Sequence, residues 1–101
     1  MEKLRRTYDL EAVKLALGSA ESWAITTSAL RDATALGFDR AAIIATVLSM
    51  DQSMFVKSMT TFADHRIWQD VYHVPARGFL LYVKFQADVV TQFTLVSFKE
   101  K

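Results

Sequence analysis

The spacing of apolar residues changes near the middle of the chain, and this change constrains the fold more than any other feature. Up to about residue 50, apolar side chains recur every three or four positions, as they do along one face of a helix. From residue 53 onward they alternate with polar ones, which is typical of strands buried on one side. We therefore predict an α+β fold, with N-terminal helices packed on one face of a four-stranded antiparallel sheet.

The first half contains signals for three helices. Each apolar stripe follows a residue that favours an N-cap, and Gly18 and Gly37 come where the first two stripes end. Residues 22–26, which read "SWAIT", fit either a short strand or a connection. The predicted helices and their caps are residues 10–17 after Asp9, 29–36 after Ser28 and 40–50 after Asp39.

The second half contains four strand-like segments joined by short connections. The segments are rich in β-branched and aromatic residues, and the single proline lies in the second connection. Parallel neighbours would need crossovers of about a dozen residues, so the short connections predict an antiparallel meander. The predicted strands are residues 53–60, 67–74, 79–86 and 93–99.

Composition sets the class of protein and excludes several kinds of chemistry. The chain has 101 residues, which suits a single domain over 1–101, and its net charge of +1 does not by itself indicate a nucleic-acid partner. It has no cysteine, which excludes disulfides, thiolate metal sites and cysteine nucleophiles. The longest apolar run, "AAIIATVL", is far shorter than the roughly 20 residues of a membrane span. We expect a cytoplasmic protein that does not enter the membrane.

The polar stretch "KSMTTFADHRIWQDVY", residues 57–72, connects the first predicted strand to the second. If this connection is centred on Ala63, Lys57 lies opposite Gln69. If the next connection is centred within "VPAR", Gln69 lies opposite Tyr82. The three side chains then form one row across three strands, spaced by about 4.8 Å per strand.

The residues around this row divide between two faces by parity. Phe55, Met59 and Lys84 share its face, whereas the other face is apolar and suits a layer beneath the helices. A polar sheet face in contact with water needs no function, and this simpler interpretation stays open. The residues predicted for the buried face are Val56, Trp68, Tyr72, Leu81, Val83 and Phe85.

Other candidate sites are weaker. His65 follows Asp64 and is a candidate general base, although a histidine in a connection is more often only solvated. His65 and His73 lie on different segments, so we predict no metal site. The chain has no glycine-rich phosphate loop and no serine–histidine–aspartate arrangement. We predict no cofactor.

The stretch quoted above and the closing "LVSFKEK" resemble the MqsR family of bacterial toxins, the motility quorum-sensing regulator family. The resemblance covers nearly the whole chain and is densest over 54–72 and 95–101. It implies a fold similar to the RelE and YoeB toxins, and a sequence-specific endoribonuclease that cleaves single-stranded mRNA without the ribosome. It also implies a cognate antitoxin of the MqsA type, which binds zinc and carries a DNA-binding helix-turn-helix, so that the toxin reaches DNA only indirectly.

The family's catalytic lysine, glutamine and tyrosine fall on Lys57 in "VKSM", Gln69 in "IWQD" and Tyr82 in "LYVK". The resemblance and the strand pairing therefore indicate the same three residues. The sequence departs from the family pattern at Val56, where an aromatic residue is expected, and over residues 86–93, where the connection is longer. Further contacts with RNA are expected from Met59, His65, Arg77 and Lys84.

Such a site would use the 2′-OH of RNA as its nucleophile and would need no metal. Lys57 would neutralise the charge that builds on the phosphate, and Gln69 would hold a phosphate oxygen or the 2′-OH. Tyr82 would donate toward the leaving oxygen. Lysine and tyrosine have reference pKa values of about 10, so a general base requires a depressed pKa at Lys57 or a loop that folds His65 over the row. We favour mainly electrostatic catalysis.

Two alternatives from other classes remain open at this stage. In the first, the chain is a non-catalytic module whose sheet face binds a protein partner. In the second, it is an mRNA nuclease that acts only on the ribosome, as in the wider RelE group. Cleavage of naked RNA by the purified chain separates the ribosome-independent nuclease from both.

Overall fold

The computed structural model describes residues 1–18, 24–87 and 93–101, and within these ranges it contains three α-helices and a five-stranded sheet. The α+β class is confirmed, and β1 is a fifth strand where four were predicted. The helices are α1 (Leu10–Leu17), α2 (Thr27–Ala35) and α3 (Arg40–Ser49), and a 3-10 turn, η2, spans Gln52–Met54. The strands are β1 (Glu2–Lys3), β2 (Phe55–Thr60), β3 (Trp68–Ala76), β4 (Phe79–Ala87) and β5 (Phe93–Glu100).

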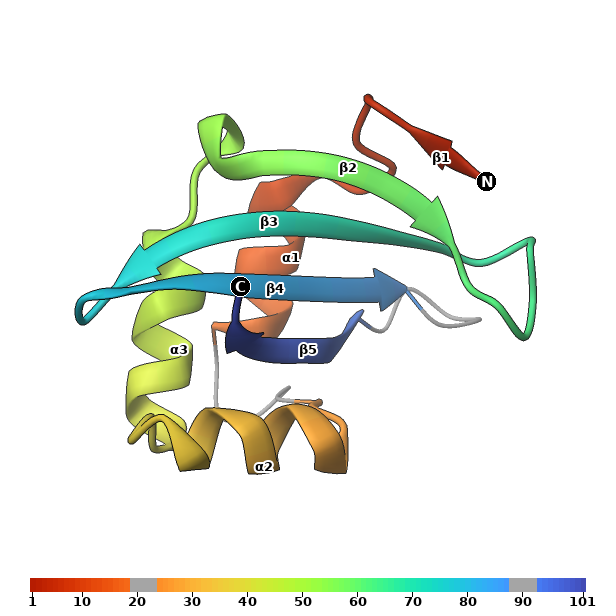
Figure 1. Cartoon of the computed structure of the whole chain (residues 1–101). Coiled ribbons are helices and arrows are strands. Elements are labelled where there is room, and N and C mark those ends of the chain that lie inside the picture. Colours follow the sequence, from red (N-terminus) through yellow and green to blue (C-terminus); the bar gives the residue numbers. More distant parts are fainter. Residues whose placement is uncertain (19–23, 88–92) are drawn as a thin grey trace.

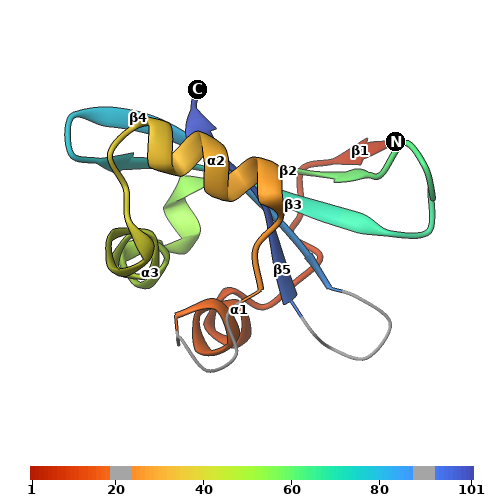
Figure 2. The ribbon, with the colours of Figure 1, turned by 90° about the horizontal axis from the view of Figure 1, so that it is seen from below.

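The sheet is an antiparallel meander in the order β1-β2-β3-β4-β5, as the short connections predicted. Helices α1 and α3 lie behind the sheet in Figure 1, and α2 runs below β5. The view from below places α1 and α3 on the same side of the strands (Figure 2). Among the described elements, the helices therefore cover one face of the sheet and leave the other open. Similarity to the RelE and YoeB fold stays a prediction.

Local capping chemistry sets the helix ends. Asp39 is the N-cap of α3, as predicted, and its carboxylate accepts a hydrogen bond of 2.8 Å from the Ala42 N–H. The N-cap of α2 is Thr26 and not Ser28, because the Thr26 hydroxyl accepts from the Ala29 N–H at 3.2 Å. Ser28 lies inside the first turn of a helix that begins before its apolar stripe. No helix in the described part of the chain is long and apolar enough to cross a membrane.

Short pieces of backbone cover both edges of the sheet. On one side, β1 pairs with β2. On the other side, Ile25 forms a parallel bridge with Leu95, whose N–H donates to the Ala24 carbonyl at 2.9 Å. The ambiguous segment is thus strand-like where it is described, and residues 22–23 lie outside the described ranges. Covered edges protect a sheet from pairing with other chains.

The turn between β3 and β4 comes two residues later than predicted. Arg77 and Gly78 form it with φ angles of 52° and 82°, the pair of left-handed conformations that defines a type I′ turn. β3 consequently runs through Pro75, at a position where it no longer pairs with β2. A proline, which lacks the N–H, is tolerated in such an edge position.

Both predicted registers are wrong by an even number of residues. Gln69 lies opposite Met59 and Gln86, and not opposite Lys57 and Tyr82. Side chains alternate along a strand with a period of two, so an even shift leaves each side chain on its predicted face. Lys57, Gln69 and Tyr82 therefore share the open face, but they do not form one straight row.

A β-bulge at the start of β2 separates two nearby side chains. Phe55 lies opposite Tyr72 and Lys57 lies opposite Val71, with Val56 unpaired between them. The Phe55 ring packs edge-on against the Tyr72 ring on the helix side, with 5.5 Å between the ring centres. The prediction that Phe55 shares the face of Lys57 is therefore wrong. Val56 is only half-buried in the bulge, which corrects the core position predicted for it.

The hydrophobic core lies between the covered face of the sheet and the helices. The strands contribute Tyr72, Leu81, Val83 and Phe85, all buried as predicted, whereas Trp68 is half-buried. Burial of this apolar surface is the dominant stabilising contribution, and it holds the open face in a defined shape. The helices contribute Leu10, Val13, Leu17, Ala29, Ala33, Ile43 and Val47.

One buried carboxylate ties the amino-terminal segment to the sheet. Asp70 on β3 is 0% exposed, and it accepts hydrogen bonds from the Thr7 N–H at 3.0 and 3.1 Å and from the Tyr8 N–H at 2.9 Å. The Thr7 and Ser58 hydroxyls are 2.7 Å apart, and the Tyr8 hydroxyl donates to the Trp68 carbonyl at 2.7 Å. The chain that precedes α1 is thereby fastened across β2 and β3.

Asp70→Ala should lower the free energy of unfolding by about 2–3 kcal/mol, because it leaves the N–H groups of Thr7 and Tyr8 without their acceptor. Urea denaturation measures this loss. Asp32→Ala is the matched control: it removes the same charge from a side chain that is 39% exposed on α2, and should change stability by less than about 0.5 kcal/mol. Equal losses in both variants would mean that net charge, and not the buried hydrogen bonds, is responsible.

Candidate active site on the open face of the sheet

The open face gathers the three polar residues that the sequence indicated. Lys57 comes from β2, Gln69 from β3 and Tyr82 from β4. Across the sheet, Lys57 and Tyr82 are two strand steps of about 4.8 Å apart. Along β4, the residue opposite Gln69 is Gln86, four positions from Tyr82. Three rows of directly opposite residues cross the face, namely Met59–Gln69–Gln86, Lys57–Val71–Lys84 and His73–Tyr82–Lys99.

Lys57 is held by a residue from the other end of the chain. Its ammonium group donates to the Glu2 carboxylate at 2.8 Å, and the two side chains are 32% and 57% exposed. The hydrogen bond that Lys57 donates to Glu2 is the main cause that raises the pKa of Lys57; burial opposes it, and the charge of Glu2 raises the pKa further. Lys57 is therefore a permanent cation at neutral pH. The sequence left open that a depressed pKa could make Lys57 the general base, and the raised pKa contradicts this.

Tyr82 lies among ionisable side chains. The ammonium groups of Lys84 and Lys99 are 5.9 and 5.5 Å from the centre of its ring, which is within cation–π range. The ring centre of His73 is 6.1 Å from that of Tyr82. Negative charge that develops beside the phenol group would be stabilised by the two lysines.

Burial lowers two pKa values on this face. Burial is the main reason why the pKa of Lys84 lies below 10.5, and the charges of Lys99 and Lys57 lower it further. The pKa of His73 lies below 6.5, again through burial first and then through the charges of Lys101 and Lys57. His73 is therefore mostly neutral at pH 7, and the positive charge of the face comes from its lysines.

Gln69 is the most enclosed of the three indicated residues. It is 7% exposed, and its amide N–H donates to the side-chain oxygen of Gln86 at 2.7 Å. This bond fixes the orientation of the amide plane. The amide also has a carbonyl oxygen and a second N–H that can form hydrogen bonds.

A hollow of about 380 Å³ adjoins the face beside β1, a size typical of small-ligand sites. Phe62 and His65 reach it from the β2–β3 connection and are both exposed, and Met59 reaches it from β2. Two of the residues predicted to contact RNA, Met59 and His65, thus come together here. The complete lining is Met1, Glu2, Met59, Thr60, Thr61, Phe62 and His65.

Arg77 is separate from this group. It lies in the β3–β4 turn, whereas His65 lies at the opposite end of β3. Its guanidinium donates to the Gly37 carbonyl at 3.2 Å and sits 5.1 Å from the centre of the Phe38 ring. These contacts hold the turn against the connection between α2 and α3. The other predicted RNA contacts, Met59, His65 and Lys84, lie on or beside the open face.

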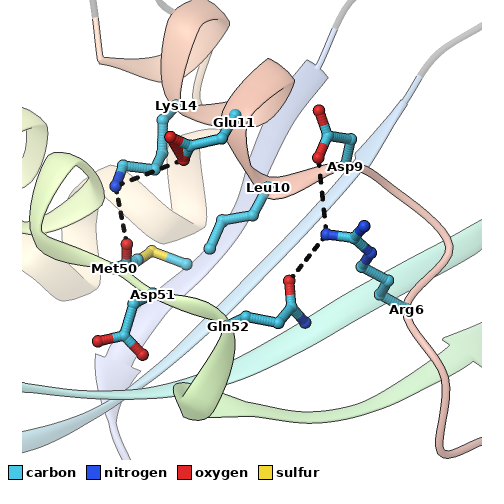
Figure 3. A pocket seen from close by; sticks show the side chains of 8 residues that line it. All are labelled: Arg6, Asp9, Leu10, Glu11, Lys14, Met50, Asp51 and Gln52. Carbon is cyan, nitrogen blue, oxygen red and sulfur yellow. Dashed lines mark hydrogen bonds and ion pairs between the residues drawn. The ribbon is translucent and has the colours of Figure 1, made fainter.

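A second hollow, of about 340 Å³, lies near the start of α1 (Figure 3). Its two cations already have partners within the chain. Arg6 donates to the Gln52 side chain at 3.1 Å, and Lys14 donates to the Met50 carbonyl at 2.9 Å. Figure 3 shows how these bonds link the α1 region to the segment before β2. Their role is to fasten the two segments together, and we assign no ligand to this hollow.

Sequence reasoning missed three residues of the open face. Glu2 lies in a strand of two residues, which is too short to produce a periodic signal. His73 and Lys99 lie in predicted strands, and parity with the correct registers places both beside Tyr82. The alternation of side chains places His73 and Lys99 on the open face, but the predicted strand register was wrong and did not bring them to Tyr82.

The open face carries cations and not a set of metal ligands. Within residues 1–18, 24–87 and 93–101, no group of three histidine, aspartate or glutamate side chains is arranged to hold a metal ion. His65 and His73 belong to different segments, the β2–β3 connection and β3. Lysine side chains supply the positive charge that a phosphate group would meet here.

Comparison with known proteins places this chain in a family. It matches the family described as "Motility quorum-sensing regulator, toxin of MqsA" over residues 5–100. It is also 42% identical over 76 residues to the mRNA interferase toxin MqsR of Escherichia coli (strain K12), an alignment that covers 75% of this chain and 76% of the relative. Matches of this extent identify the protein as a toxin. It belongs to the motility quorum-sensing regulator family, MqsR, as the resemblance in sequence implied.

The lysines of the open face should bind a single-stranded polyanion. Replacing Lys84 and Lys99 together with alanine should weaken binding of polyuridylate, and should reduce the slope of log affinity against log salt by about 0.7 for each lysine. Fluorescence anisotropy at several salt concentrations measures both effects. Arg31→Ala, which removes a cation that is 72% exposed on α2, should leave the slope unchanged. An unchanged slope in the double variant would mean that the polyanion does not cross β4 and β5.

Proposed function

We propose that this protein is the mRNA-cleaving toxin of a toxin–antitoxin pair, and that the open face of its sheet is the catalytic surface. The observation that carries this assignment is the arrangement around Lys57 and Tyr82, in which a permanent cation and a phenol surrounded by lysines occupy one solvent-facing surface. The name of the Escherichia coli relative, an mRNA interferase toxin, supports the same activity.

The reaction we propose is attack by the 2′-OH of a nucleotide on the adjacent phosphate. The oxygen–phosphorus bond that forms closes a 2′,3′-cyclic phosphate, and the bond that breaks releases a 5′-hydroxyl. RNA supplies the nucleophile, so the protein has to position the phosphate and stabilise its transition state. This division of labour needs no metal ion, and the ribosome does not enter it.

Each of the three indicated residues has a separate role in this proposal. Lys57 binds the non-bridging oxygens of the phosphate, where negative charge increases in the transition state. The amide of Gln69, oriented by Gln86, holds a phosphate oxygen or the 2′-OH. Tyr82 donates its proton to the leaving oxygen, and the nearby lysines stabilise the phenolate that results.

The substrate we propose is single-stranded RNA that lies across the strands. Recognition of sequence requires bases that are splayed out of a helix, so that their edges and faces can be contacted. The hollow beside β1 offers Met59, Phe62 and His65 for such contacts. The position of Arg77 at the far turn gives it no place in this recognition.

The family description, "toxin of MqsA", supports a cognate antitoxin as the protein partner. We propose that this partner is a zinc-binding protein with a helix-turn-helix, that it suppresses the toxin in the cytoplasm, and that the toxin reaches DNA only through it. Relief of growth arrest on co-expression would then accompany formation of the complex.

The purified chain should cleave naked single-stranded RNA in excess EDTA and produce 2′,3′-cyclic phosphate ends. A single 2′-deoxy nucleotide at the cleaved position should abolish the reaction, and the same substitution elsewhere in the strand is the matched control. Product ends can be identified by mass spectrometry. Cleavage only with ribosomes would favour a ribosome-dependent nuclease, and growth arrest without any cleavage would favour a binding module. Activity lost in EDTA and restored by a divalent ion would contradict the metal-free reaction.

Lys57→Ala should lower the single-turnover cleavage rate by about a hundredfold or more, because it removes the preorganised cation of the site. Tyr82→Phe keeps the ring and tests the hydroxyl alone. Because the two residues act on one phosphate, the double variant should lose less than the product of the single losses. Both side chains are partly exposed, so melting temperatures should stay within a few degrees of wild type. A Lys57→Ala variant that unfolds easily, or that cuts at the wild-type rate, would make this lysine structural.

A further inference from the structure

The proposed reaction lacks a group that removes the proton from the 2′-OH. Lys57 cannot accept it, because its pKa is raised and it stays protonated at neutral pH. Tyr82 is assigned to the leaving oxygen, on the other side of the phosphorus. A general base typically contributes 10²–10⁴-fold to such a step, so its identity matters for the rate.

Glu2 is the carboxylate that the fold brings to Lys57. It lies opposite Met59 in the β1–β2 pairing, and Met59 lies opposite Gln69, so the Glu2 side chain belongs to the open face. Its carboxylate accepts the hydrogen bond of 2.8 Å from Lys57, and the side chain is 57% exposed. A phosphate bound by Lys57 would therefore be next to Glu2.

We propose that Glu2 is the general base of the cleavage reaction, an inference that rests on the proposed function. The Glu2 carboxylate accepts the proton of the 2′-OH while the 2′-oxygen forms its bond to phosphorus. The bond from phosphorus to the 5′-oxygen breaks, and Tyr82 gives its proton to that oxygen. Glu2 ends as the acid and Tyr82 as the phenolate, and exchange with water restores both.

The order of the three residues across the sheet fits an in-line displacement, in which the base and the acid act on opposite sides of the phosphorus. Glu2 on β1 contacts Lys57 on β2 from one side, and Tyr82 lies on β4, on the other side of Lys57. Glu2 also lines the hollow beside β1, which gives room for the nucleotide that carries the attacking 2′-OH. The backbone of this segment is anchored, since the Thr60 N–H donates to the Met1 carbonyl at 2.9 Å.

The surroundings of Glu2 keep it ionised. Lys57 on β2 lowers its pKa below 4.5, first through the hydrogen bond and then through charge, and the amino terminus adds a smaller effect in the same direction. His65, from the β2–β3 connection, lines the same hollow. A carboxylate with a lowered pKa is ionised throughout the neutral range, so the base form is present above about pH 5.

His65, which lines the same hollow as Glu2, is one competing candidate. His73 is the other, and it is mostly neutral at pH 7. Its ring, however, lies directly across from Tyr82, with 6.1 Å between the ring centres. That position places it beside the proposed acid, on the leaving-group side. Glu2 and a histidine also predict different pH dependences. With a histidine as the base, the cleavage rate would fall near pH 6, where Glu2 is still ionised.

The test is the Glu2→Gln variant of the full chain, measured by single-turnover cleavage of a single-stranded oligoribonucleotide. The amide keeps an oxygen that can accept the hydrogen bond from Lys57 but cannot act as the base. We expect the rate at pH 7 to fall by about a hundredfold or more, while binding of the oligonucleotide stays the same or tightens because a negative charge is lost. Glu11→Gln, on the exposed side of α1, is the matched control and should behave as wild type.

The pH profile separates a base from a residue that only positions Lys57. Wild-type protein should keep an almost constant rate between about pH 5 and about pH 8, whereas the rate of Glu2→Gln should rise about tenfold per pH unit as hydroxide replaces the base. If Glu2→Gln cleaves more slowly but keeps the wild-type pH profile, Glu2 only positions Lys57. If Glu2→Gln cleaves faster than wild type, Glu2 hinders access of the phosphate to Lys57. Either result overturns the proposal, as does a wild-type rate that falls near pH 6. Wild-type protein that leaves naked RNA uncut overturns the proposed function itself.

Discussion

The buried carboxylate of Asp70 is the interaction on which the placement of the amino-terminal segment depends. A buried charge is tolerated only where hydrogen bonds satisfy it, and here its donors are the N–H groups of Thr7 and Tyr8. These bonds fix Thr7 and Tyr8 against β3. The chain that follows them begins α1, and the chain that precedes them pairs with β2 as β1. Asp70, on the covered face, thus holds the segment that follows Glu2 in the chain, and this places Glu2 on the open face.

Two irregularities let the same strands serve the core and the candidate site. The bulge in β2 turns Phe55 toward the helices while Lys57, two residues later, points to the open face. A second irregularity, where β4 pairs with β5, lets Leu95 and Phe98 both pack in the core although they are three residues apart. Without these shifts, alternation alone would direct either a lysine inward or an aromatic ring outward.

Alternation is a local property of extended backbone, and this explains which predictions succeeded. Gln69 and Tyr82 were assigned to the correct face because parity is unaffected by an even error in register. Their direct pairing was wrong, because register depends on where the turn forms, and Arg77 and Gly78 supply the left-handed conformations that a type I′ turn requires. Phe55 was assigned to the wrong face because the bulge in β2 lets its ring pack against Tyr72 on β3. The periodicity of a single strand does not reveal contacts with another strand.

The sequence by itself determined the α+β class, the helix cap at Asp39 and the membership of Lys57, Gln69 and Tyr82 in one polar face. These features follow from helix capping and from the side-chain periods of about 3.6 residues in helices and 2 in strands. Both depend only on residues that are close together in the sequence. Only the tertiary structure decided that Glu2 meets Lys57 across 55 positions of the chain and that Lys99 lies beside Tyr82. The physical reason is that contacts between distant segments require both strand registers and the buried bonds that anchor them, and neither is encoded in any short stretch of residues.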